Sequence, residues 1–315
     1  MREIGWAKRI SLAKRHFFYG MPLCLSLAGT PAVESAHLAE VPVPGSKPLR
    51  LSFYRSAASQ PVRGLIVGCH GRGGNYLHFA KSPAWRSLAD AHRFALVGLH
   101  FTSGQPDESD PCLAVSRGVE ALSAATGIAE IANAPWCTWG FSAGGAIAAF
   151  LARRYPERTI TFCHHKGKSI QTGLEPQPGA VDQVPGLLSY GELDFSRIEI
   201  IQGVFDRNRN AGAPWCLAVD WGRGHVDGGP VEAFAIAWMD TLIPMRLPEA
   251  PGMVLRPIPT RLGSLDDPGG AGAMEARAPG ETNQAAGMGR TSWLPNASLA
   301  ARWRALMSRP ASSNP

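Results

Sequence analysis

The stretch Trp139-Gly140-Phe141-Ser142-Ala143-Gly144-Gly145 decides how this chain folds. It contains a G-x-S-x-G pentapeptide, follows a short apolar run at residues 135–139, and opens a run of small and apolar residues at 143–154 that is typical of a helix. A strand, a sharp turn and a helix in this order predict a nucleophile elbow, in which a strained turn presents the serine hydroxyl. Glycines suit both flanks of Ser142, because a Cβ there would collide with neighbouring backbone. The alternative is a glycine-rich turn that exposes a serine without a chemical role.

Apolar runs alternate with helical patterns from about residue 48 to about residue 245. The predicted strands cover residues 48–55, 63–69, 94–99, 135–139, 159–163, 184–190 and 214–219, and the predicted helices cover residues 84–92, 115–125, 143–154, 197–208 and 231–242. This alternation predicts an α/β fold with a mostly parallel central sheet and helices on both faces. Residues 48–55 alternate apolar and polar side chains, as a half-buried edge strand does. Functional loops of such a sheet lie at the carboxyl ends of its strands.

The serine of an elbow needs an acid and a base that follow it in the chain. A serine hydroxyl is a weak nucleophile at neutral pH, so a histidine must take its proton and a carboxylate must orient that histidine. Gly191-Glu192-Leu193-Asp194 directly follows the strand predicted at 184–190. We take Asp194 as the acid and Glu192 as the second choice, because a turn after a strand projects its last carboxylate at the sheet edge. Asp194 could instead cap the next helix.

His225 is the candidate base. It lies in Gly222-Arg223-Gly224-His225, after the strand predicted at 214–219, and glycines there allow the loop to swing the imidazole over the sheet. His164, His165 and His70 also follow strands. The first two precede the acid, which is the wrong chain order for an elbow of this type, and could line a pocket together with Lys166.

The tetrahedral intermediate of acyl transfer needs two hydrogen-bond donors for its oxyanion. One is expected from the backbone N–H of Ala143, the residue after the nucleophile, and the other from the loop His70-Gly71-Arg72-Gly73-Gly74. We assign the second donor to the Arg72 backbone, with Gly73 as the alternative. A phosphate-binding loop is the competing interpretation, but neither G-x-x-x-x-G-K-[ST] nor a G-x-G-x-x-G that opens a helix is present.

In this order and spacing, HGRGGN, GFSAGG, GELD and GRGH resemble the α/β-hydrolase superfamily. The pairing of HGxGG with GxSAGG resembles its branch of polyhydroxybutyrate-depolymerase-like and feruloyl-esterase-like enzymes, over residues 48–245. The resemblance implies the α/β-hydrolase fold, a catalytic triad of Ser142, Asp194 and His225, and an oxyanion hole from Arg72 and Ala143. No cofactor is expected for this chemistry, and no Cys/His spacing suggests a metal. The chain departs from such depolymerases because it shows neither a stapling disulfide pattern nor a substrate-binding module, so degradation of a polymer is not expected.

These motifs predict a serine hydrolase that cleaves carboxylic esters through an acyl-enzyme. A peptidase, a thioesterase or an acyltransferase would use the same triad, and the fold could also serve as a binding protein without activity. The partner expected is a small-molecule ester. Nucleic-acid binding is not expected, because no basic cluster with interleaved aromatic residues occurs. The oligomeric state stays open.

The N-terminus carries much of the positive charge. The whole chain has 31 Lys+Arg against 25 Asp+Glu, and without residues 1–35 the excess falls to 26 against 23. A basic stretch at residues 2–16 precedes an apolar stretch at 17–29 and small residues, which predicts a signal peptide over 1–35 and export to the periplasm or the medium. If this segment is not a signal, the protein would be cytoplasmic. No other stretch reaches the length of a membrane span.

The sequence divides the remainder into three parts. Residues 36–245 are expected to form the catalytic domain, beginning with an extended segment at 36–47, and residues 246–290, rich in Pro, Gly and Ala, to be irregular. Residues 291–315 are expected to contain a helix capped by Asn296 or Ser298 that docks on the domain. Five of the six cysteines lie beyond the signal segment, mostly in predicted core strands, which favours buried free thiols.

Overall fold

The computed structural model describes residues 37–41, 49–56, 61–101, 110–168, 184–250, 252–259, 263–266 and 291–309. These residues belong to one compact unit, Glu34–Pro315. The predicted signal segment lies outside them, as do most of the Pro/Gly/Ala-rich stretch and the loops at 102–109 and 169–183.

One eight-stranded sheet runs through the described residues, with its strands in the order β1-β2-β4-β3-β5-β6-β7-β8. The strands are β1 (His37–Val41), β2 (Leu49–Tyr54), β3 (Gly64–Cys69), β4 (Phe94–Phe101), β5 (Trp136–Phe141), β6 (Thr159–His165), β7 (Gly186–Gly191) and β8 (Trp215–Asp220). The β1–β2 and β2–β4 pairs are antiparallel, whereas every other pair is parallel. The predicted mostly parallel sheet is therefore confirmed.

The prediction that residues 48–55 form an edge strand is wrong. β1 pairs with the outer side of β2, with His37 opposite Phe53 and Val41 opposite Leu49, so β1 takes the edge. The polar position Ser52 is buried rather than solvated, because its hydroxyl donates a hydrogen bond of 3.2 Å to the Tyr76 carbonyl. The alternation in this strand therefore does not mark a face in contact with water.

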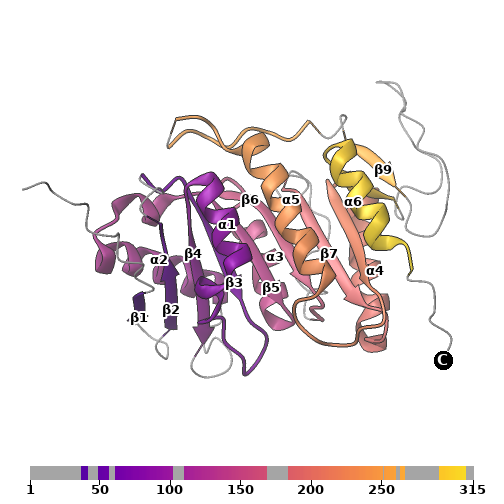
Figure 1. The fold of residues 1–315 in the computed structure, drawn as a ribbon, viewed down its shortest axis with the longest axis horizontal. Coiled ribbons are helices and arrows are strands. Elements are labelled where there is room, and N and C mark those ends of the chain that lie inside the picture. Colours follow the sequence, from indigo (N-terminus) through magenta and orange to yellow (C-terminus); the bar gives the residue numbers. More distant parts are fainter. Residues whose placement is uncertain are drawn as a thin grey trace, which may run out of the picture. The chain divides into compact units, whose positions relative to one another are not determined.

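Helices cover both faces of the sheet, as the sequence predicts (Figure 1). They are α1 (Pro83–His92), α2 (Pro111–Thr126), α3 (Ala143–Arg154), α4 (Phe195–Asn210), α5 (Pro230–Arg246) and α6 (Ala297–Met307). Leu65 and Val67 of β3 pack with α2 and α3 on one face, whereas Ile66 packs with α1 on the other. No helix in the described part of the chain combines the length and the apolar character that crossing a membrane requires.

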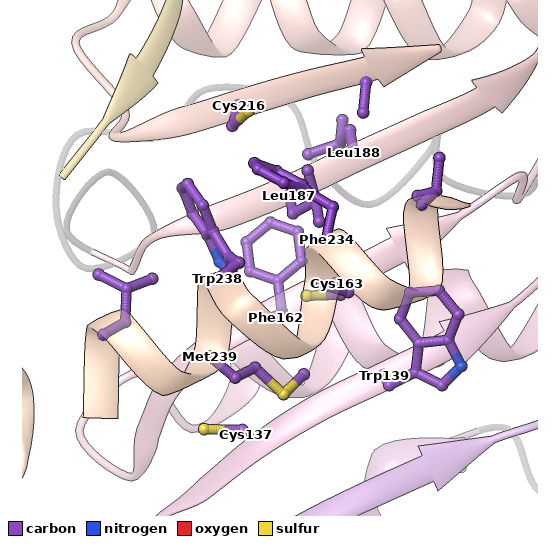
Figure 2. Close-up of a cluster of buried hydrophobic side chains, with 14 of the residues drawn as sticks. Cys137, Trp139, Phe162, Cys163, Leu187, Leu188, Cys216, Phe234, Trp238 and Met239 are labelled. Carbon is purple, nitrogen blue, oxygen red and sulfur yellow. The ribbon is translucent and has the colours of Figure 1, made fainter. Parts of the chain in front are cut away.

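The core beneath α5 is built from large aromatic residues and thiols. Figure 2 shows Phe234, Trp238 and Met239 of α5 over the sheet, near Phe162 of β6. The Trp238 indole N–H satisfies the buried hydroxyl of Thr161 with a bond of 2.8 Å. Three cysteines of this region lie on β5, β6 and β8: Cys137, Cys163 and Cys216.

All cysteines of the described residues, including Cys69 and Cys112, are buried and free, as the sequence favours for those in the predicted core strands. Burial disfavours the charged thiolate and so raises their pKa values, to about 12 for Cys112. These thiols are structural rather than reactive.

Residues 291–309 cover the free edge of β8. They contribute β10 (Ser292–Leu294), which pairs with β9 (Ser264–Asp266), and α6, whose first turn is capped by the Asn296 side chain through a bond of 2.8 Å to the Leu299 N–H. Side chains of this segment form hydrogen bonds with backbone groups on the outer edge of β8, where no strand of the described residues pairs with it. The Leu217 N–H donates to Ser292 Oγ at 2.9 Å, and the Leu217 carbonyl accepts from Trp303 Nε1 at 2.8 Å. These contacts replace a further strand and shield an edge that could otherwise pair with another chain.

Truncation after residue 259 is expected to destabilise the protein and to promote self-association. The cut removes Trp293, Leu294, Leu299 and Trp303, all at least 98% buried, so we expect a loss of at least about 5 kcal/mol of unfolding free energy. Urea unfolding followed by tryptophan fluorescence measures the loss, and light scattering measures association. A chain ending after residue 309 is the matched control. Unchanged stability of the shorter chain would show that the segment is dispensable.

Candidate active site

Ser142 stands in a strained turn between β5 and α3. Its backbone has φ 56° and ψ −122°, a region that only glycine adopts without cost. The turn is tight: a Cβ added to Gly140 would lie 2.0 Å from the Gly144 carbonyl oxygen, and one added to Gly144 would lie 2.0 Å from that of Cys69. The Ser142 N–H donates to the His165 carbonyl at 2.8 Å, which ties the turn to the end of β6.

One imidazole joins the candidate nucleophile to the candidate acid. His225 Nε2 lies 2.9 Å from Ser142 Oγ, and His225 Nδ1 lies 2.8 Å from Asp194 Oδ2. The Asp194 carboxylate is buried, with 5% of its side chain exposed, whereas the His225 side chain is 30% exposed. Phe141 stacks on the imidazole with ring centroids 4.8 Å apart. An Nδ1–H bond to the carboxylate leaves Nε2 free to accept the serine proton.

Asp194, not Glu192, reaches the histidine. Asp194 precedes α4, yet its side chain makes no cap hydrogen bond, and its second oxygen accepts from Arg197 Nη1 at 2.7 Å. Glu192 faces elsewhere: its carboxylate accepts from the Gly222 N–H at 2.8 Å and from Arg309 Nη2 at 2.6 Å. The alternative role of Asp194 as a helix cap is therefore not what the structure displays.

The turn with the acid and the loop with the base pack backbone against backbone. The Leu193 N–H donates to the Arg223 carbonyl at 3.0 Å. A Cβ added to Gly191 would lie 2.3 Å from the same carbonyl oxygen, so only glycine permits this approach. This packing fixes the separation of Asp194 and His225.

The loop after β3 approaches Ser142 through Gly71. A Cβ added to Gly71 would lie 2.8 Å from Ser142 Cβ. A turn closes from the Gly74 N–H to the Gly71 carbonyl at 3.1 Å, with Arg72 and Gly73 at its centre and Gly73 at φ 74°. A type II turn places glycine at that position. Ala143 is the first residue of α3, where helix N–H groups have no partner within the helix.

Sequence reasoning missed a polar link between the loop after β3 and the loop that carries His225. The Tyr76 hydroxyl donates to Asp227 Oδ2 at 2.5 Å and accepts from Trp139 Nε1 at 2.9 Å. Burial and the Asp227 charge raise the pKa of Tyr76, so the phenol stays a neutral donor. The signal in the sequence is only positional: Tyr76 directly follows HGRGGN, and Asp227 follows His225 by two residues.

The expectation that His164, His165 and Lys166 line a pocket is wrong. All three are buried, with at most 1% of each residue exposed. His165 Nδ1 lies 2.7 Å from Ser189 Oγ, and its ring stacks on Trp139. Burial disfavours the imidazolium, so the pKa of His164 falls to about 4 and that of His165 falls well below its usual value. Among the described residues, no group of three or more His, Cys, Asp or Glu could hold a metal ion.

Acidification is expected to destabilise the fold through His164. A histidine with a lowered pKa in the folded state binds fewer protons than in the unfolded state, so stability falls as the pH drops from about 6.5 to about 4. The full effect of this group is about 3 kcal/mol of unfolding free energy. Urea unfolding at several pH values should give a weaker pH dependence for His164→Leu than for the wild type. The exposed His78→Gln is the control and should not change it. An equal pH dependence of the unfolding free energy in all three proteins would contradict the lowered pKa of His164.

The strand order and the strained serine turn after β5 define the α/β-hydrolase fold. The sequence matches no protein-family model and no curated protein.

Several solved structures are similar in chain path. A CIB-like hydrolase from Thermoplasma acidophilum is 12% identical, with 66% of this chain and 99% of that chain covered and a TM-score of 0.47. LpqC, a poly(3-hydroxybutyrate) depolymerase from Bordetella parapertussis, is 19% identical over 64% of this chain and 86% of that chain, with a TM-score of 0.43. A Bacillus cereus carboxylesterase is 18% identical, with 62% of this chain and 94% of that chain covered and a TM-score of 0.46. At these values the likeness says nothing about activity.

Proposed function

We propose that the protein is a serine hydrolase that cleaves carboxylic esters through an acyl-enzyme intermediate. The observation that carries the proposal is the imidazole of His225, which lies within hydrogen-bonding distance of both Ser142 Oγ and Asp194 Oδ2. The strained backbone of Ser142 supports it, since strain of this kind is retained where the surrounding structure holds a functional group in place.

In the first half of the reaction, His225 takes the proton of Ser142 as Oγ attacks the ester carbonyl. Asp194 holds the ring in the required tautomer and stabilises the imidazolium. The backbone N–H groups of Ala143 and Arg72 are the proposed donors to the oxyanion. The bond from the carbonyl carbon to the alcohol oxygen then breaks, and His225 gives its proton to the departing alcohol.

In the second half, His225 takes a proton from water while the water oxygen attacks the acyl-enzyme. The bond to Ser142 Oγ breaks, the serine regains its proton, and the carboxylic acid leaves. No redox step occurs and no further reactant is consumed.

Three exposed apolar side chains adjoin the proposed acid and base in the chain. Leu193, Phe195 and Val226 are exposed at 52%, 76% and 47%, and each adjoins Asp194 or His225 in the chain. Side chains of this kind suit the apolar part of a small ester better than a charged one.

A peptidase, thioesterase or acyltransferase would use the same three residues, so a substrate panel has to separate them. We expect hydrolysis of p-nitrophenyl esters to exceed that of the matched anilides. Product analysis with added methanol would reveal an acyltransferase through the methyl ester, and an acyl thioester would reveal a thioesterase. Tight binding of an ester without turnover would support a binding protein. The export signal remains a proposal from the sequence, and the intact mass of the protein from its native host would test it.

Labelling with a fluorophosphonate tests the proposed function directly. The reagent should form one covalent adduct, on the peptide that contains Ser142, and should stop hydrolysis of a short p-nitrophenyl ester. A control sample unfolded in urea should not react, because the hydroxyl then lacks its base. No adduct on the folded protein would contradict the proposal.

A further inference from the structure

Lys166 follows β6 directly and is entirely buried, with 0% of its side chain exposed. Its Nζ atom donates to Asp220 Oδ2 at 2.7 Å, to the Gly224 carbonyl at 3.0 Å and to the Val226 carbonyl at 2.8 Å. We propose that the Lys166 ammonium group is a positioning residue, which fixes the loop of His225 so that its imidazole reaches Ser142.

The two carbonyls belong to the residues before and after the histidine. The Val226 N–H also donates to the Gly224 carbonyl at 3.0 Å, so His225 stands at the centre of a three-residue turn. Such a turn has few internal bonds and would be mobile alone. Lys166 bonds the carbonyls at both ends of the turn, so the imidazole of His225 has little freedom to change its orientation.

The chemistry of the site suits an ammonium group. Lysine has three N–H donors on one nitrogen, and three acceptors surround Nζ within 3.0 Å. Burial lowers the pKa of Lys166, while the Asp220 carboxylate opposes that shift. Arg223 Nε lies 3.0 Å from the same carboxylate oxygen, so Asp220 is itself held in place from the base loop.

The backbone beside Lys166 also holds the nucleophile. The His165 carbonyl accepts the Ser142 N–H at 2.8 Å, and Lys166 has φ 55°, an uncommon value for a residue with a side chain. Gly167 follows, where an added Cβ would lie 2.6 Å from the Ser142 carbonyl oxygen. Residues 165–167 therefore set the serine turn through their backbone and the histidine turn through one side chain, so both reacting groups share one support.

This inference rests on the proposed function, because positioning has catalytic meaning only if His225 is the base. The test is Lys166→Met in the full chain, which keeps a long unbranched side chain and removes the charge and all three donors. We expect kcat for a p-nitrophenyl ester to fall about 10- to 100-fold, with KM within about twofold of wild type, because a displaced base affects the chemical step rather than substrate binding.

Arg246→Met is the matched control. Arg246 is also a buried cation, and its Nη1 donates to the Thr159 and Ile160 carbonyls at 2.9 and 3.0 Å, at the opposite end of β6. We expect a comparable loss of stability in both variants, measured by urea unfolding, but a lower kcat in Lys166→Met alone. An equal fall of kcat in both would mean that the core, and not the base loop, is responsible.

A signal that is independent of turnover completes the test. The Nδ1–H proton of His225, bonded to Asp194, should give a low-field ¹H NMR resonance in the wild type and in Arg246→Met, and should be broadened or lost in Lys166→Met. Retention of that signal and of wild-type kcat in a folded Lys166→Met protein overturns the proposal. If Lys166→Met does not fold, Lys166→Gln takes its place with the same criteria. If the wild type neither turns over esters nor takes the phosphonate, the proposed function fails, and the resonance still decides the role of Lys166.

Discussion

Ser142→Ala is expected to abolish ester hydrolysis and phosphonate labelling while the protein remains folded. The proposed acyl-enzyme needs the Oγ atom, which lies 2.9 Å from His225 Nε2. We expect kcat to fall by about 10⁴- to 10⁶-fold. The residual activity would come from the oxyanion donors and from substrate binding alone. The measurement is turnover of a short p-nitrophenyl ester, with circular dichroism to verify folding.

Ser142→Gly makes the test sharper, because activity and stability should move in opposite directions. Glycine adopts φ 56° without strain, so this variant should be inactive and yet more stable than wild type by about 1 kcal/mol. Turnover by either variant at more than a few per cent of the wild-type rate would exclude Ser142 as the nucleophile.

Among the single substitutions, Gly144→Ala is expected to have the largest effect on stability. The added Cβ would lie 2.0 Å from the Cys69 carbonyl oxygen and 2.6 Å from that of His70. Both are backbone atoms at the end of β3, so α3 would have to move away from the sheet. We expect a loss of more than about 4 kcal/mol of unfolding free energy, measured by urea unfolding, or no soluble protein.

Gly203→Ala is the matched control for that substitution. Gly203 lies within α4, and the nearest atom to an added Cβ is Arg207 Nη1, the far end of a long side chain, at 3.4 Å. The same chemical change should therefore stabilise the protein by about 0.5–1 kcal/mol, because alanine is the better helix former. If Gly144→Ala were as stable as Gly203→Ala, the close packing of α3 on β3 would be wrong.

Local pattern was enough to predict most of the fold. The helix expected at 143–154 is α3, because small residues and a glycine-rich turn define its start and Tyr155-Pro156 its end. The sequence placed the end of the last helix of the domain too early: α5 continues through Pro244 to Arg246. A proline disfavours a helix, but here tertiary packing outweighs that preference. The Arg246 guanidinium bonds the start of β6 and holds the last turn.

The positions of Ser142, Asp194 and His225 could be proposed from the sequence because each follows a strand, and parallel strands bring their carboxyl ends together. The role of Lys166 could not be proposed from the sequence, since a lysine in a polar loop usually faces solvent. Only the path of the loop that carries His225 shows that three acceptors converge on its Nζ atom. The hydrogen bond from Tyr76 to Asp227 could not be predicted either, because the two residues are 151 positions apart in the sequence.

The reduced state of the buried cysteines bears on how the protein can be produced. Across the described residues, Cys69, Cys112, Cys137, Cys163 and Cys216 form no disulfide, and burial disfavours their thiolates. This part of the chain can therefore reach its folded state without an oxidising step or a disulfide isomerase. A bacterial host that keeps its interior reducing should yield the same folded domain as one that exports it.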